Sequence, residues 1–88
     1  MATQASDKAP RDGHVSIDGT PWLARMIDKA RLERTGEIVQ FDLDFPCPMD
    51  RQLLSKLGID AKQFQEIAVT SPDDASIVKA LKVAGASL

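Results

Sequence analysis

Two groups of side chains in this 88-residue chain could take part in chemistry. The first follows the only tryptophan, where cations and acids are closely spaced: Trp22, Arg25, Asp28, Lys29 and Arg31. The second is the sequence CPMD, which holds the only cysteine, Cys47, three residues before Asp50. An indole next to guanidinium and ammonium groups is typical of a surface that binds an anionic ligand or an acidic partner.

The first group also fits a solvent-exposed helix face. Residues three or four apart on a helix are neighbours, so Arg25, Asp28 and Lys29 could neutralise one another. Such exposed pairs each contribute only about a few tenths of a kcal/mol. The binding interpretation is the more specific one, because it predicts a partly exposed Trp22 and no internal partner for Arg25 or Lys29.

Cys47 precedes Pro48, a residue that favours the first turn of a helix. Asp50 then stands at the third helical position, where its carboxylate can accept the Cys47 backbone N–H in a capping box. Helix N-terminal N–H groups stabilise a thiolate, whereas the carboxylate of Asp50 opposes it. A structural cap and a reactive or redox-sensing thiol both fit this pattern. A dyad of Cys47 with His14, the only histidine, is a weaker alternative.

Other chemistry finds little support in the sequence. One cysteine and one histidine cannot supply the roughly four ligands of a closed zinc site, so we expect no metal. Glycine-rich phosphate loops, serine nucleophile motifs and spaced catalytic carboxylates are absent from the sequence, so we assign no catalytic residue and expect no cofactor.

The first group of residues is positioned by a predicted helix. Thr20 is a suitable N-cap and Pro21 a suitable first helical residue. Gly36 supplies a C-terminal stop. Five apolar side chains then share one face of this helix: Trp22, Leu23, Met26, Ile27 and Ala30.

Residues 37–45 (EIVQFDLDF) separate the two groups and alternate in polarity from Val39 onward. This period of two is typical of a half-buried strand. No second convincing strand is available to pair with it. We therefore expect an extended connector laid over the helices, or an edge that pairs with a second copy in a homodimer.

Three further helices complete the predicted fold. Cys47, Asp60 and Ser71 are their expected N-caps. Their apolar faces are predicted to hold the following residues: Met49, Leu53, Leu54 and Leu57; Phe64, Ile67 and Ala68; Ile77, Val78, Leu81 and Ala84. We expect an all-α, small four-helix domain over residues 14–88, with an extended connector between helices 1 and 2, preceded by a disordered tail over residues 1–13.

Charge and hydropathy exclude several classes of protein. The net charge of −2 argues against a dedicated nucleic-acid binder. No apolar run approaches the roughly 20 residues of a membrane span, and the N-terminus lacks the apolar core of a signal peptide. We expect a cytoplasmic protein. Residues 37–50 hold four acids and no base. We therefore expect Asp50 or Asp44 to meet Arg25 or Lys29 and clamp the second helix to the first.

The stretches PWLARMIDKAR (21–31), CPMD (47–50) and LLSKLGID (53–60), followed by Phe64, resemble the small bacterial proteins of domain-of-unknown-function family 5069. The resemblance implies a bacterial protein without an assigned activity, so it transfers no catalytic role. Where the family is expected to carry a tyrosine before the CP dipeptide, this chain has Phe41 and Phe45. The positions that match the family pattern are Trp22, Leu23, Arg25, Asp28, Lys29, Arg31, Cys47, Pro48 and Asp50.

These observations favour a non-enzymatic interaction or regulatory module that binds a protein or a small anionic ligand through the surface of Trp22, Arg25 and Lys29. A thiol-dependent enzyme or redox sensor centred on Cys47 is the alternative, and a structural homodimer is a third.

Overall fold

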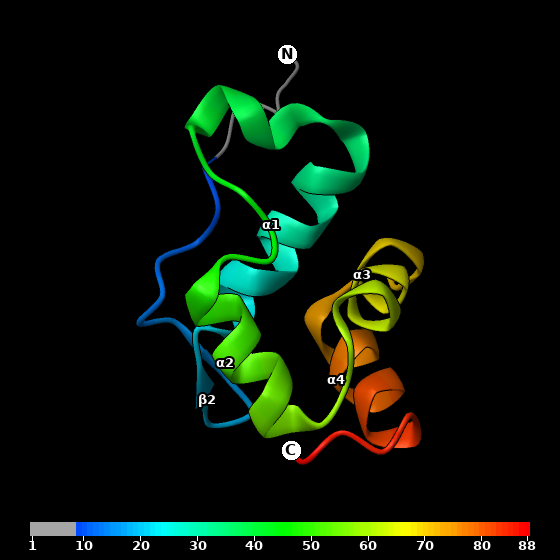
Figure 1. Ribbon diagram of the computed structural model, residues 1–88. Coiled ribbons are helices and arrows are strands. Elements are labelled where there is room, and N and C mark those ends of the chain that lie inside the picture. The colour runs from blue at the N-terminus through cyan, green and yellow to red at the C-terminus, as the bar shows by residue number, and fades with distance from the viewer. Residues whose placement is uncertain (1–8) are drawn as a thin grey trace.

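The computed structural model describes residues 9–88. Within this part of the chain, α1 runs through the middle, with α2 on one side and the pair α3 and α4 on the other (Figure 1). The four predicted helices are confirmed, and a two-stranded antiparallel sheet is added to them. The elements are β1 (Ser16–Ile17), β2 (Thr20–Pro21), α1 (Leu23–Thr35), the 3-10 helix η2 (Glu37–Phe41), α2 (Pro48–Leu57), α3 (Ala61–Thr70) and α4 (Asp74–Val83).

The start of α1 differs from the prediction. Thr20 and Pro21 form β2 and pair with β1 in the register Ile17 to Thr20 and Ser16 to Pro21. This pairing holds Thr20 in an extended conformation, so α1 begins at Leu23 instead. Gly36 ends the helix as predicted, in the left-handed region at φ 82°.

The segment after α1 also differs, because residues 37–41 form η2 and not an extended strand. The alternating pattern predicted an inward Val39, but this side chain is 76% exposed and Ile38 is buried in its place. A 3-10 helix has three residues per turn, so its side chains point in three directions and do not alternate between two faces. Ile38 is the buried residue of this short element. The strand edge that supported the homodimer prediction is therefore not formed over Glu37–Phe41.

The N-cap of α2 is confirmed, with the reciprocal capping box between Cys47 and Asp50. The Asp60 carboxylate accepts the Gln63 backbone N–H at the start of α3, also as predicted. The prediction for α4 is wrong by two residues. Asp73 caps this helix by accepting the Ser76 N–H, whereas Ser71 ends α3.

The core lies between α1 and the other helices. The Phe45 and Phe64 rings, 6.2 Å apart, connect the segment before α2 to α3. The Ser87 N–H donates to the Leu57 carbonyl, which holds the C-terminal segment against the end of α2 (Figure 1). Two residues of the predicted apolar faces are exposed, since Met49 has an exposed fraction of 49% and Ala84 is also exposed. Three more are only partly buried: Trp22, Ile67 and Val78. The core residues are Leu23, Met26, Ile27, Ala30, Leu53, Leu54, Leu57, Ile59, Phe64, Ala68, Ile77 and Leu81.

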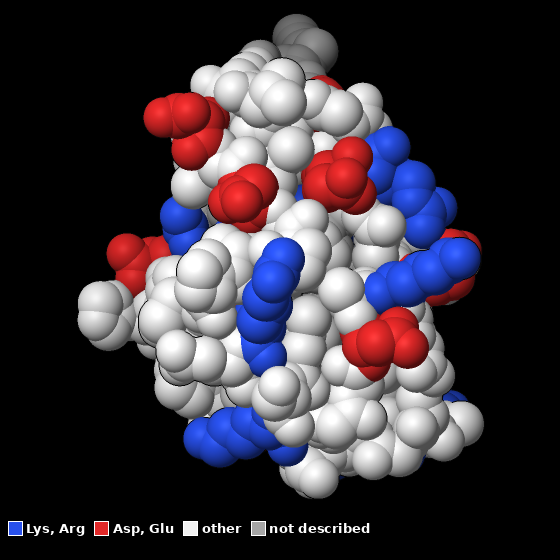
Figure 2. All heavy atoms as spheres, in the orientation of Figure 1, with Lys and Arg blue, Asp and Glu red and all other residues white. Residues whose placement is uncertain are grey.

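The N-terminal segment before β1 packs against the helices. Of the predicted tail, residues 1–8 lie outside the described residues, while Pro10 is buried and Arg11 bonds to both α1 and α4. Among the described residues, no helix is long and apolar enough to cross a membrane. Acidic and basic side chains are interspersed with uncharged surface on the face that Figure 2 shows.

Candidate functional site

Three of the predicted site residues donate hydrogen bonds to the buried carboxylate of a fourth, Asp50. Its Oδ1 accepts a hydrogen bond from Trp22 Nε1 at 2.8 Å. Its Oδ2 accepts from Lys29 Nζ at 2.7 Å and from the Cys47 backbone N–H at 3.0 Å. We call Trp22, Lys29, Cys47 and Asp50 the Asp50 cluster. It joins the N-cap and the middle of α1 to the start of α2.

The Lys29–Asp50 ion pair is buried on both sides, with side-chain exposures of 2% and 0%. A buried ion pair is tolerated only when further hydrogen bonds satisfy its polar atoms. Both oxygens of Asp50 meet this condition, and Lys29 Nζ also lies 3.1 Å from Cys47 Sγ. The predicted contact between the two helices is thus observed, with Asp50 and Lys29 as its partners. Asp44 is exposed.

Trp22 has an unusual backbone conformation for a bulky residue, with a left-handed φ of 75°. Such a conformation costs about 1–3 kcal/mol and persists only where the surroundings enforce it. Here the Trp22 N–H donates to the Gly13 carbonyl, and the indole donates to Asp50. The ring also lies so close to Gly13 that a Cβ atom there would overlap it. Trp22 is partly exposed, as predicted.

The prediction that Arg25 and Lys29 have no internal partner is wrong. Lys29 is buried because its ammonium group is the counter-ion of Asp50, so it cannot meet an external anion. The Arg25 guanidinium lies over the Trp22 ring, 5.6 Å from the centroid, and donates to the Arg11 carbonyl. The proposed anion-binding surface therefore loses the ammonium group on which it depended.

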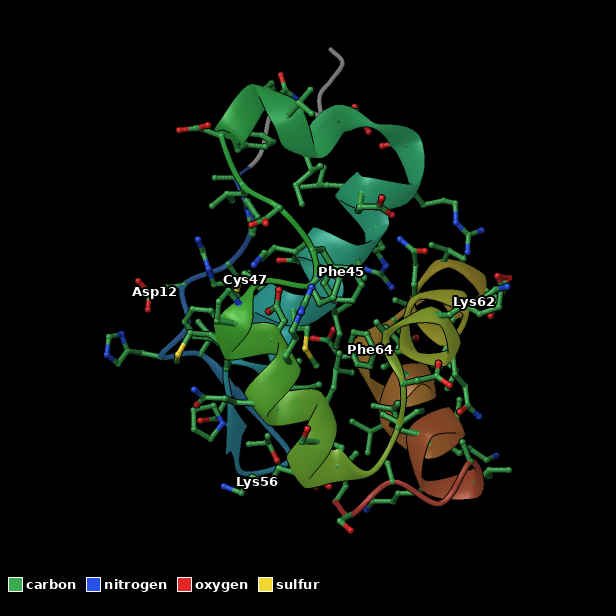
Figure 3. The ribbon with its side chains drawn as sticks, viewed as in Figure 1. Asp12, Phe45, Cys47, Lys56, Lys62 and Phe64 are labelled. Atoms are coloured by element: carbon green, nitrogen blue, oxygen red, sulfur yellow. The ribbon has the colours of Figure 1, made fainter. Side chains whose placement is uncertain are left out.

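Cys47 is partly exposed and stands at the N-terminus of α2 (Figure 3). Its Sγ lies 3.1 Å from the buried ammonium group of Lys29. His14 does not form the alternative dyad, since its ring is fully exposed and bonded to Asp12. No group of three or more metal-ligating side chains is found over residues 9–88.

Asp28 and Arg31, the other two predicted site residues, lie apart from the Asp50 cluster. Arg11 Nε donates to Asp28 Oδ2 at 2.9 Å, and Arg11 Nη1 donates to Asp74 Oδ2 at 2.7 Å. The hydrogen bond from Arg11 lowers the pKa of the Asp74 carboxyl group, and the two carboxylates raise the pKa of the guanidinium group. Arg31 donates to the carbonyls of Ala68 and Ser71 at the end of α3.

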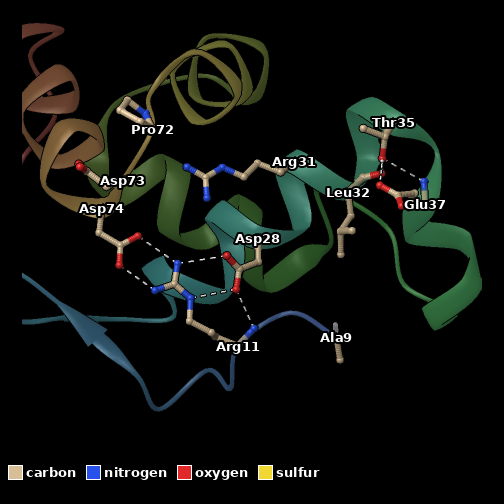
Figure 4. A pocket seen from close by; sticks show the side chains of 10 residues that line it. All are labelled: Ala9, Arg11, Asp28, Arg31, Leu32, Thr35, Glu37, Pro72, Asp73 and Asp74. Carbon is tan, nitrogen blue, oxygen red and sulfur yellow. Dashed lines mark hydrogen bonds and ion pairs between the residues drawn. The ribbon is translucent and has the colours of Figure 1, made fainter. Parts of the chain in front are cut away.

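These side chains line a groove of about 560 Å³, which we call the Asp28 groove. Its wall carries two guanidinium groups and four carboxylates, so the net charge of the lining side chains is −2. Figure 4 shows Asp73 and Glu37 towards opposite ends, with Arg31 and Leu32 between them. The volume is within the range of about 300–1,000 Å³ that is usual for small-ligand sites. The lining residues are Ala9, Arg11, Asp28, Arg31, Leu32, Thr35, Glu37, Pro72, Asp73 and Asp74.

Sequence reasoning missed most of this groove. Arg11 lies in a polar segment with no periodic pattern, so nothing indicated that it would bridge α1 and α4. Glu37 and Asp73 lie on separate elements that only the fold brings to one cavity. The acidic start of α4 was the one available signal, and it is explained equally well by helix capping.

The chain belongs to the family described as domain of unknown function (DUF5069), whose model matches residues 7–87. No curated protein and no solved structure matches the chain.

Proposed function

We propose that this member of the DUF5069 family is a non-enzymatic binding module and that the Asp28 groove holds a small organic cation with an aliphatic body, such as a linear diamine. The observation that carries this proposal is the excess of carboxylates over guanidinium groups in a cavity of ligand size. The proposal keeps the predicted interaction role, but it moves the site away from Lys29 and reverses the charge of the ligand.

The two guanidinium groups of the groove are already engaged. Arg11 is shared between Asp28 and Asp74, and Arg31 donates to two backbone carbonyls. Glu37 and Asp73, by contrast, pair with no basic side chain among residues 9–88. Each accepts a hydrogen bond from the protein, yet a carboxylate offers about four acceptor positions.

The chemistry of the walls suits an amine at each end and methylene groups between. The hydrogen bond from the Ser76 N–H lowers the pKa of Asp73. A carboxyl group whose pKa is at or below the ordinary value is ionised at neutral pH. Leu32 and Pro72 add apolar surface along the groove. An ammonium group bound to a carboxylate makes a charge-assisted hydrogen bond, about twice as strong as a neutral one.

The test is a titration of the full chain with putrescine and spermidine, followed by the backbone amide signals in NMR. We expect saturable shifts near Glu37 and Asp73, and an affinity that falls with ionic strength. The double variant Asp73→Asn/Glu37→Gln removes both charges, and asparagine still caps α4. We expect it to bind at least about tenfold more weakly.

Asp60→Asn is the matched control, because it changes an N-cap acid outside the groove in the same way. Succinate, a dicarboxylate, is the control ligand. The proposal is wrong if neither amine causes saturable shifts, if the double variant binds them as tightly as the native chain, or if succinate binds equally well.

A second candidate function is an oxidant-responsive thiol at Cys47, favoured by the contact of 3.1 Å between its Sγ and Lys29 Nζ. Cys47 is partly exposed and stands at the start of α2, a position typical of reactive cysteines. We expect iodoacetamide to label Cys47 rapidly in the folded protein near neutral pH. Slow labelling in the folded state, with rapid labelling only in urea, would exclude this function.

A further inference from the structure

Among residues 9–88, an oxidised Cys47 sulfur has one nucleophilic side chain in hydrogen-bond contact, that of Lys29. A sulfenic acid is normally trapped by a second thiol or by a backbone nitrogen. Cys47 is the only cysteine of the chain, so it has no intramolecular thiol partner. The next residue is Pro48, whose nitrogen carries no hydrogen. The Lys29 amine, 3.1 Å from Sγ, is the side-chain nucleophile in contact with the sulfur.

From this geometry we infer that oxidised Cys47 is captured by Lys29, which joins α1 to α2 through a sulfur–nitrogen bond. The inference rests on the second proposed function, the reactive thiol. The Lys29 side chain is held for this reaction, because burial and the bond of 2.7 Å to Asp50 restrict it to one position. Its amine therefore remains next to the sulfur and does not move into solvent.

The reaction needs one equivalent of hydrogen peroxide. In the first step Sγ attacks a peroxide oxygen, so that the S–O bond forms and the O–O bond breaks. The sulfur loses two electrons to the peroxide, and the leaving hydroxide takes the thiol proton as water. In the second step Lys29 Nζ gives one proton to Asp50 and attacks the sulfur. The S–N bond forms, the S–O bond breaks, and hydroxide leaves as water with a second proton from the nitrogen.

The buried position of the pair is compatible with this chemistry. An isolated charge in the interior is strongly unfavourable. Lys29 and Asp50 begin as an ion pair of no net charge and end as a neutral sulfenamide and a neutral carboxylic acid. Neither step leaves one charge without the other. Asp50 also keeps its hydrogen bonds from Trp22 and from the Cys47 backbone.

The product closes a covalent loop around the segment between α1 and α2. A cross-link of this kind restricts the unfolded chain as a disulfide does, so the oxidised protein should resist unfolding better than the reduced protein. A thiol reductant should reverse the link, because thiolates attack sulfur bound to a leaving group. The cross-link would therefore act as a reversible oxidative switch on the α1–α2 contact.

The test treats the dilute full-length chain with hydrogen peroxide and follows its intact mass. We expect a loss of about 2 Da, the mass of two hydrogen atoms, that dithiothreitol reverses. Trypsin should release residues 26–31 and 35–51 as one joined peptide, since the bridged Lys29 is no longer cleaved. Lys29→Arg should abolish the link, and Lys56→Arg, which changes an exposed lysine on α2, should not.

The joined peptide of the native chain decides the question even if Lys29→Arg fails to fold. A lasting gain of about 16 Da that reacts with dimedone would overturn the cross-link but leave a reactive thiol. An unchanged mass would overturn both. A gain of about 14 Da in the same joined peptide would mean a bridging oxygen, and a disulfide-linked dimer would mean an intermolecular partner; either would refute the S–N bond.

Discussion

Replacing Lys29 by methionine tests the buried ion pair most directly. Methionine has a similar length and no charge, so Lys29→Met leaves Asp50 buried with two hydrogen bonds and no counter-ion. Removing one partner of a buried pair costs about 3–5 kcal/mol. For a domain of this size each 1 kcal/mol lowers the melting temperature by about 4–8 °C, so we expect a fall of at least about 12 °C. This loss is a large part of the usual stability of about 5–15 kcal/mol.

The assay is urea denaturation followed by tryptophan fluorescence and circular dichroism. Trp22 is the only tryptophan and bonds to Asp50, so its emission reports on the cluster itself. Lys56→Met is the matched control, because Lys56 is an exposed lysine on α2, and we expect it to change the free energy of unfolding by less than about 0.5 kcal/mol.

A second variant separates loss of the charge pair from loss of packing. Lys29→Met/Asp50→Asn removes both charges, while the amide oxygen of asparagine can still accept a hydrogen bond from Trp22 or Cys47. We expect it to recover at least about 1 kcal/mol of the stability lost in Lys29→Met. If Lys29→Met costs less than about 1 kcal/mol, or if the double variant is no more stable, the pair is not the clamp between α1 and α2.

Three further outcomes are expected. Gly13→Ala should destabilise the fold by about 1–3 kcal/mol and shift the fluorescence, because the new methyl group overlaps the indole ring. Stability should fall as the pH drops below about 4, because the Asp74 pKa is lowered in the folded state; Arg11→Gln should weaken this dependence in urea midpoints measured from pH 6 to pH 3. Asp73→Ala should cost about 1 kcal/mol in thermal unfolding, whereas Ser71→Ala should cost much less, since only Asp73 caps α4.

Most of the helices could be predicted because their signals are local. The capping residues Cys47 and Asp60 and the stop at Gly58 act within one turn of the chain. The contact between α1 and α2 could also be predicted, because the acidic segment before α2 and the basic residues of α1 carry opposite charges. Which acid and which cation would meet depended on the fold.

The errors arose where distant contacts override local preference. Thr20 is a good N-cap, but pairing with Ile17 holds it in β2. Residues 37–45 alternate in polarity like a strand, but no strand among residues 9–88 pairs with them. Residues 37–41 instead form a 3-10 helix, whose backbone hydrogen bonds lie within the segment. In both cases the hydrogen-bond partner decides the conformation.

Local signals in the sequence predict the four α-helices, most of their ends and most of the residues of their inner faces, because capping and hydrophobic periodicity depend on neighbours along the chain. The roles of the polar residues depend on the fold. It buried Lys29 with Asp50 beside Cys47, and it placed Arg11 between α1 and α4. The sequence does not show which groups surround a charged side chain, so its role depends on the groups that folding brings within hydrogen-bond distance.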